Sequence, residues 1–314
     1  EWIVAEADES DGSFTMLPST IGVINNIDFE HVDFYNSIKE VKNSFIKYAK
    51  NIPFDGFLSI NNDDKNIKSI FNKIKQIRIF TYGFSSNSNY YAQNIKTIKK
   101  GNRFYTSFDI ASNLNNKSLT KNICIPLIGK HNVLNTLAAY SVAKGLKISD
   151  SKIKKALNKY KGVKRRFSII HQSSKNLIID DYAHHPNEIR VTLSALKSIT
   201  KNKLITIFEP HRYSRIESFL SEFVNSFKFA DTIFILPVYN AGEKINKDIN
   251  NIYLSHVFKK KYKNKLIESI INLNSFFKNL KKLITNGDNI IFLGAGKSSK
   301  VAESFKEFLK NNEN

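Results

Sequence analysis

The sequence has little of several residue types that mark particular classes of protein. Its 314 residues include one cysteine, one methionine and one tryptophan. A lone cysteine cannot form an internal disulfide, so we expect neither a disulfide framework nor a sulfur-ligated metal site. Cys124, between two isoleucines, is expected to be a small buried hydrophobe. Because no apolar run approaches the roughly 20 residues of a membrane span, we expect a cytosolic, soluble protein.

Acidic residues are also few, with 28 Asp and Glu against 48 Lys and Arg, which gives a net charge of +20. Such a charge would suit a nucleic-acid partner, because basic surfaces release counterions from phosphates. The lysines are scattered through every segment, however, and the cluster Lys259–Lys261 ends a predicted surface helix. We therefore favour a solvated surface with no nucleic-acid partner, and keep a basic, non-catalytic nucleic-acid-binding module as the alternative.

The length suits two domains, since domains usually have roughly 100 to 200 residues. The segment 162–167 is the natural junction, which divides the chain into residues 1–163 and 164–314. From residue 177 onward apolar runs alternate with segments of helical periodicity, which predicts a doubly wound, mostly parallel sheet. Before the junction a similar α/β pattern gives way, between residues 90 and 126, to alternation typical of a small antiparallel sheet, with a turn at Lys100-Gly101-Asn102.

Two polar segments are predicted at one edge of the first sheet. The apolar run Trp2–Ala5 predicts a buried strand followed by the acidic stretch 6–11, and a second predicted strand, Ile21–Ile24, precedes His31. Carboxylates with one imidazole suit Mg²⁺ or Mn²⁺ better than a structural zinc site. A solvated loop with helix caps is the alternative interpretation.

Asn132 and Asn135 lie three residues apart near the start of a predicted helix, 136–144, that Gly145 closes. Free N–H groups at a helix start favour an anion or a polar ligand. Asparagine at that position is also a common cap, so both interpretations stay open.

Four polar turns follow strands of the predicted second sheet. They are residues 180–186 (Asp-Asp-Tyr-Ala-His-His-Pro), 209–215 (Glu-Pro-His-Arg-Tyr-Ser-Arg), 237–243 and 294–297 (Gly-Ala-Gly-Lys). Carboxyl ends of parallel strands meet at one edge, so we expect these turns to converge on one crevice. His211, Arg212 and Arg215 predict an anion site, because guanidinium groups bind carboxylates bidentately. The glycine pair lacks the third glycine of a dinucleotide motif, and we interpret it as a tight turn.

Taken together, eight ordered motifs resemble those of the Mur ligases, most closely the ligases that join L-alanine to UDP-N-acetylmuramic acid. They are Glu6–Asp11, Asn26-Ile27-Asp28 with His31, Gly129–Asn132 with Asn135, Arg165-Arg166-Phe167, Asp180–Pro186, His211–Arg215, Tyr239 with Ala241-Gly242-Glu243, and Gly294-Ala295-Gly296. The resemblance covers nearly the whole chain. It implies the remainder of a central ATPase-type α/β domain with a small antiparallel sheet, followed by a Rossmann-like amino-acid-binding domain.

The resemblance also implies a reaction, its cofactors ATP and Mg²⁺, and residue roles. ATP would phosphorylate the carboxylate of UDP-N-acetylmuramic acid, and the amine of L-alanine would then attack the acyl phosphate. The implied roles are Mg²⁺ binding for Glu6 and His31; nucleotide binding for Asn132, Asn135, Arg166 and Asp181; carboxylate binding for His211, Arg212 and Arg215; and orientation or deprotonation of the amine for His184. His184 as a turn-stabilising residue is the alternative. A comparable lysine is carbamoylated in some relatives, and the sequence leaves open whether Lys42 is.

The sequence departs from the family pattern at its start, because it contains neither the amino-terminal UDP-binding domain nor a Gly-x-x-Gly-Lys-Thr phosphate loop. We therefore expect a fragment that is inactive alone. Ala183 stands where relatives often carry glycine. The alternatives are another Mur-type ligase that uses a different amino acid and a related ligase that reattaches a recycled tripeptide. The longer basic insertion expected of the recycling enzyme is missing.

Overall fold

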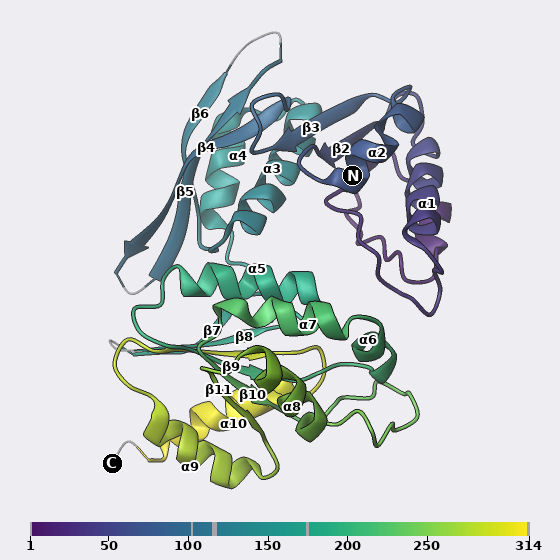
Figure 1. Cartoon of the computed structure of the whole chain (residues 1–314). Coiled ribbons are helices and arrows are strands. Elements are labelled where there is room, and N and C mark those ends of the chain that lie inside the picture. The colour runs from purple at the N-terminus through teal and green to yellow at the C-terminus, as the bar shows by residue number, and fades with distance from the viewer. Residues whose placement is uncertain (1, 102, 115–117, 174–175, 313–314) are drawn as a thin grey trace. The chain divides into compact units, whose positions relative to one another are not determined.

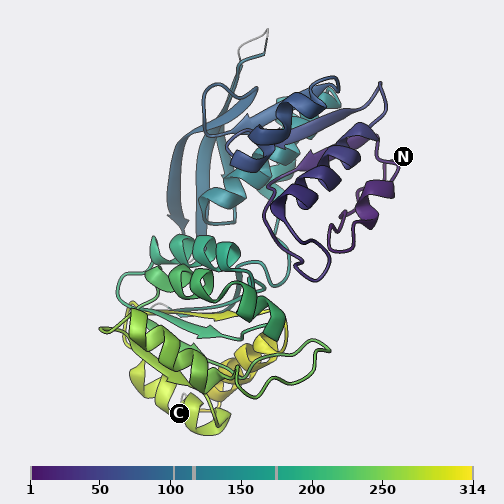
Figure 2. The ribbon, with the colours of Figure 1, turned by 45° about the vertical axis from the view of Figure 1, so that its right-hand side comes forward.

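The computed structural model describes residues 2–101, 103–114, 118–173 and 176–312. The chain divides into two compact units, the first built mainly from residues up to Tyr160 and the second mainly from residues after it. Each unit contains one six-stranded sheet with helices packed on it (Figures 1 and 2). The predicted turn at Lys100-Gly101-Asn102 includes Asn102, which lies outside the described residues.

The sheet of the first unit has the order β1-β2-β3-β4-β5-β6. Its strands are β1 (Ile21–Ile24), β2 (Phe57–Asn61), β3 (Ile79–Gly83), β4 (Tyr90–Lys100), β5 (Arg103–Ser112) and β6 (Leu119–Ile125). Strands β1 to β4 pair in parallel, whereas β5 and β6 pair antiparallel. The antiparallel part therefore continues the parallel sheet instead of forming a separate one.

Helices of the first unit bury an apolar side, and two of them begin at a side-chain cap. They are α1 (Ile38–Lys50), α2 (Lys65–Ile74), α3 (Lys130–Gly145) and α4 (Asp150–Lys159), with the 3₁₀ helix η1 (Ser13–Met16). Ser37 caps α1 by accepting from Glu40 N, and Asp64 caps α2. Val41 of α1 and Ile67 of α2 pack in one core with Ile24 of β1.

The predicted strand Trp2–Ala5 is wrong. The segment adopts neither helix nor strand, and the side chains of Trp2, Ile3 and Val4 are 64%, 93% and 97% exposed. A strand needs a partner for its backbone groups. Strand β1, at the edge of its sheet, pairs only with β2. Neither sheet includes the apolar segment, so in the described residues it has no strand beside it.

The second unit confirms the predicted doubly wound sheet, with the order β11-β10-β9-β12-β8-β7. Its strands are β7 (Ser168–Gln172), β8 (Leu177–Asp181), β9 (Leu204–Phe208), β10 (Thr232–Ile235), β11 (Leu266–Ser269) and β12 (Asn289–Leu293). All neighbouring strands are parallel except the pair β7 and β8. The edge strand β7 was not predicted, because its residues are only partly buried and carry little apolar signal.

Helices cover both faces of this sheet, with α5 and α7 on one side and α9 and α10 on the other (Figures 1 and 2). The helices are α5 (Pro186–Lys197), α6 (Tyr213–Ser218), α7 (Leu220–Ser226), the 3₁₀ helix η2 (Phe227–Phe229), α8 (Asn251–Lys261), α9 (Leu273–Leu283) and α10 (Ser298–Lys310). The apolar periodicity of residues 216–228 predicts a single helix, but the structure breaks it at Phe219, whose φ of −128° is not helical. No helix in the described ranges is long and apolar enough to cross a bilayer.

Candidate functional site

The carboxyl edge of the second sheet brings the four predicted polar turns together. The ring centroids of His184, after β8, and His211, after β9, are 5.4 Å apart. The His211 ring stacks on Tyr239, after β10, with centroids also 5.4 Å apart. A Cβ added at Gly296, after β12, would lie 2.5 Å from the Tyr239 ring. One side-chain cluster therefore draws on four separate strands.

His184 sits in a position that fixes its tautomer. Its Nδ1 lies 3.0 Å from the carbonyl oxygen of Tyr182 and 3.4 Å from the Glu188 carboxylate. Both of these atoms are acceptors, so Nδ1 carries the proton and Nε2 keeps a lone pair. Burial lowers the pKa of His184, and Arg215 adds to this effect against the opposing carboxylate of Glu188. The imidazole is therefore neutral and basic at Nε2 near pH 7.

His211 is neutral for a related reason. Burial, His184 and Arg215 together lower its pKa to about 4. An Arg215 terminal N–H group lies 3.3 Å from His211 Nδ1, and because guanidinium nitrogens only donate, Nδ1 is the acceptor. Arg215 therefore lies beside uncharged imidazoles. Because His211 is neutral, it adds no second positive charge that would repel the guanidinium group.

Arg212 precedes α6 with an unusual backbone conformation, φ 65°. Its N–H donates to Tyr239 O, 2.9 Å away, which ties the turn after β9 to the turn after β10. Glu243 completes this connection, because its carboxylate accepts from the N–H of Tyr213 (2.6 Å) and from the hydroxyl of Ser214. Glu243 therefore holds the segment that carries both predicted carboxylate-binding arginines.

Asp181 and Arg166, both predicted to bind the nucleotide, have protein partners in this structure. Asp181 is 4% exposed, and its oxygens accept from Phe167 N (2.7 Å) and Ala183 N (2.8 Å). Burial raises its pKa to about 6. Arg166 donates to Glu188 at 3.1 Å. Asp181 thus links the junction to β8, and its role in nucleotide binding stays a prediction.

Three glutamates that were assigned no role by sequence reasoning shape this edge: Glu188, Glu209 and Glu243. Each accepts backbone N–H groups at the start of a helix. Glu188 lies at the third position of α5, and the spacing of a capping box was a signal that could have found it. Glu209 and Glu243 reach helices far away in the chain, so no local pattern reveals them.

In the first unit, Asp8, Glu9 and His31 form a group whose possible metal-ligand atoms lie within 4.8 Å of one another. His31 Nε2 is 3.4 Å from Glu9 Oε1, and this contact lowers the pKa of Glu9. A hydrogen bond from the Ser10 backbone lowers the pKa of Asp8. Glu6, the predicted metal ligand, is exposed and stands outside the group. Two carboxylates and one imidazole fit a hard divalent cation.

Asn132 and Asn135 lie within the first turns of α3, because that helix begins at Lys130, earlier than predicted. Asn135 is exposed, whereas Asn132 is half-buried and its side-chain amide lies 2.9 Å from His131 Nε2. Both asparagines thus stand near the end of α3 where N–H groups are free of helical partners. Lys42 is half-buried on α1. Cys124 is also half-buried, so it is less buried than predicted.

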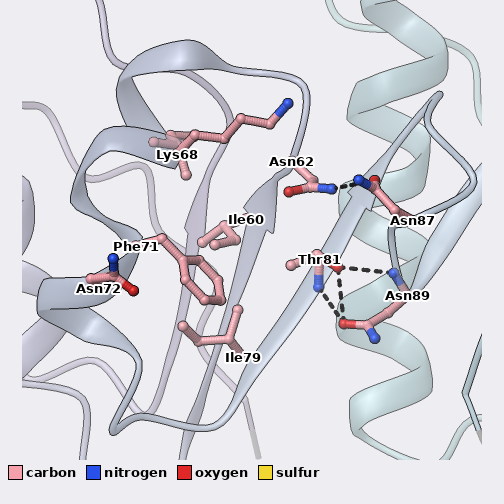
Figure 3. A pocket seen from close by; sticks show the side chains of 10 residues that line it. Ile60, Asn62, Lys68, Phe71, Asn72, Ile79, Thr81, Asn87 and Asn89 are labelled. Carbon is pink, nitrogen blue, oxygen red and sulfur yellow. Dashed lines mark hydrogen bonds between the residues drawn. The ribbon is translucent and has the colours of Figure 1, made fainter.

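The two best-formed pockets among the described residues lie elsewhere. One of about 530 Å³ is formed by β2, α2, β3 and the loop before β4 (Figure 3). The polar groups on its rim bond to one another, with Asn62 donating to Asn87 and Thr81 donating to Asn89. Another of about 680 Å³ lies between α7 and α8. Neither is lined by a predicted site residue.

Two family models match the chain. Residues 3–143 match the Mur ligase middle domain, and residues 165–296 match a domain described as Mur ligase, glutamate ligase domain. The two matches follow each other in the chain, and the second begins within the junction.

Curated relatives match nearly the whole chain. Proteins named UDP-N-acetylmuramate–L-alanine ligase are 41% identical in Pelagibacter ubique, 37% in Rickettsia bellii and 38% in Persephonella marina. The matches cover 98%, 99% and 100% of this chain and 66%, 66% and 65% of the relatives. The chain therefore spans about two thirds of the length of these relatives.

Solved structures share the fold. The UDP-N-acetylmuramate-alanine ligase of Thermotoga maritima matches with a TM-score of 0.73 and 23% identity, covering 97% of this chain and 63% of that one. The MurF ligase of T. maritima in complex with ADP matches with a TM-score of 0.73 and 15% identity, covering 96% and 65%.

Proposed function

The chain belongs to the Mur ligase family, and from this premise we propose that the full-length protein joins L-alanine to UDP-N-acetylmuramic acid in peptidoglycan precursor synthesis. The observation that carries the proposal is the run of relatives with that named activity, at 37–41% identity over nearly all of this chain. The proposal includes the cytosolic location expected from the sequence. It also assigns nucleotide binding to residues 1–163 and amino-acid binding to residues 164–314.

The proposed reaction has two bond-forming steps. A carboxylate oxygen of UDP-N-acetylmuramic acid attacks the γ-phosphorus of ATP, and ADP leaves. The ammonium group of L-alanine loses a proton, and the resulting amine nitrogen attacks the activated carbonyl carbon. The C–O bond to phosphate breaks, and the nitrogen loses a second proton. Such chemistry depends mainly on position and on neutralising charge.

The second unit offers groups suited to the amino acid. Arg212 and Arg215 are candidates for its carboxylate, since guanidinium groups bind carboxylates in a fixed geometry. His184 presents a neutral imidazole, with Nδ1 held by the Tyr182 carbonyl. Its Nε2 is therefore suited to accept a proton from the alanine ammonium group. His211, neutral and stacked on Tyr239, fills the space beside Arg215.

The first unit offers groups suited to Mg²⁺ and nucleotide. Asp8, Glu9 and His31 would hold the cation, which when bound would neutralise phosphate charge. Metal binding by Glu6 stays a prediction from family resemblance. Asn132 and Asn135, at the start of α3, are suited to a polar or anionic ligand. A protein of the same fold is described in complex with ADP, which supports a nucleotide ligand for this fold.

Arg215 offers a test of the amino-acid site. In the full-length protein we expect Arg215→Ala to raise the KM for L-alanine by about tenfold to a hundredfold, because a hydrogen bond to a charged group contributes about 1.5–3 kcal/mol. Arg190→Ala, on the exposed side of α5, is the matched control and should leave KM unchanged. Steady-state ADP release at varied L-alanine measures both. Equal KM values for the two variants would contradict the assignment.

A further inference from the structure

We propose that Glu209 acts as an internal anion that fills the phosphate-type turn of the second unit and so excludes nucleotide phosphates from it. The turn joins β12 to α10 and contains Gly294 and Gly296. Glycine-rich turns of this kind, at the start of a helix after a parallel strand, bind phosphate in many α/β folds. Here the acceptor comes from the protein itself.

The contacts of Glu209 reproduce those of a bound anion. Its Oε1 accepts from Lys297 N at 2.8 Å, and its Oε2 accepts from Gly296 N at 3.0 Å and Ser298 N at 3.1 Å. Three consecutive N–H groups thus converge on one carboxylate. The partial positive charge at the start of α10, a helix of 13 residues, favours a negative group there.

The surroundings leave no volume for a second anion. Glu209 is 4% exposed. A Cβ added at Gly296 would lie 2.8 Å from Glu209 Oε2 and 2.5 Å from the Tyr239 ring, and a Cβ at Gly294 would lie 2.8 Å from Glu209 Cβ. The turn is therefore packed directly against the carboxylate side chain. A phosphate could reach these amides only if Glu209 moved away.

The same carboxylate connects to the candidate amino-acid site. Glu209 precedes His211 by two residues, and Gly296 is held between Glu209 and Tyr239, on which His211 stacks. Glu209 is thus a positioning residue for the His211–Tyr239 pair. The exclusion of phosphate itself does not depend on the proposed ligase activity, so either conclusion can fail without the other.

Amide resonances of Gly296, Lys297 and Ser298 report on this turn directly. We expect millimolar inorganic phosphate to leave them unshifted in the unsubstituted chain at pH 7 and to shift them saturably in Glu209→Ala. Glu222→Ala, which removes an exposed acid from α7, is the matched control and should behave like the unsubstituted chain. Saturable shifts in the unsubstituted chain, or none in folded Glu209→Ala, would overturn the proposal.

A second measurement covers the case in which Glu209→Ala does not fold. Burial raises the pKa of Glu209, against the opposing effect of its three amide partners. In the unsubstituted chain we expect the three amide resonances and the Glu209 carboxyl carbon to titrate with one common midpoint on acidification. Amide resonances that ignore the protonation of Glu209 would show that the carboxylate does not occupy the turn.

Discussion

Carboxylates that accept backbone N–H groups determine much of the residue-level chemistry in the second unit. Asp181, Glu188, Glu209 and Glu243 all do so. Asp181 and Glu209 are buried, and Glu188 and Glu243 are half-buried. Burial alone would raise the pKa of Glu188, but His184 and Arg166 beside it bring that pKa below its usual value. Asp181 has no such compensation from a neighbouring histidine. These acids hold the site in shape, and the neutral histidines and the arginines are the groups that we propose for ligand binding.

Asp181 should make stability depend on pH. Its pKa of about 6 in the folded state exceeds the ordinary 3.8, so the folded state binds the proton more tightly than the unfolded state. Stability is therefore expected to fall as pH rises from about 4 to about 6, by up to about 3 kcal/mol for two pH units at about 1.4 kcal/mol each. Urea unfolding across that range measures the slope.

Asp181→Asn should flatten this slope, even though an amide nitrogen facing a backbone donor lowers stability at every pH. Glu268→Gln, at an exposed position of β11, is the control and should keep the slope of the unsubstituted chain. A slope unaltered by Asp181→Asn would show that another group is responsible.

At the scale of single elements, helix caps set the boundaries. Asp64 Oδ1 accepts from Asn66 N at 2.9 Å and Ile67 N at 2.8 Å at the start of α2. We expect Asp64→Ala to lower the free energy of unfolding by about 1 kcal/mol, as loss of a cap does. Asp64→Asn keeps an acceptor and should cost only a fraction of that. Chemical denaturation measures the free energy of unfolding of both variants. An equal loss of stability in the two variants would contradict a capping role.

The sequence predicted elements well where local pattern and tertiary environment agree. The apolar periodicity of residues 38–50 predicts a helix and the apolar run 204–208 predicts a strand. Helix α1 and strand β9 have these bounds, because in each case the apolar side chains meet a core on the expected side. Trp2–Ala5 has an equally apolar pattern but no neighbouring strand among the described residues. Strand β7 forms by pairing with β8 despite a weak pattern of its own. Long-range pairing decides both cases.

The candidate site also combines features that local pattern predicts with features that depend on long-range contacts. His184 and His211 were predictable, because polar residues after buried parallel strands meet at one edge of the sheet. Glu209 was not, because its amide partners lie 87 to 89 residues further along the chain. The glycine turn after β12 was correctly interpreted as a tight turn, but the group that fills it was visible only in the structure.

At the scale of the whole molecule, the two units supply different chemistry. The first carries the acids and His31 suited to a cation, and the second carries the arginines and neutral histidines suited to an amino acid. The net charge of +20 is spread through the sequence. A salt-dependent gel shift at physiological ionic strength would be the mark of the alternative nucleic-acid-binding role.

The most direct test of the central claim is ADP release by the full-length protein supplied with ATP and Mg²⁺. The same assay on residues 1–314 alone tests the separate expectation that these residues do not suffice for turnover. For the full-length protein we predict sustained ADP formation over many turnovers only when UDP-N-acetylmuramic acid and L-alanine are both present. Sustained ADP formation that is independent of L-alanine, or that occurs only with a different amino acid, would contradict the account.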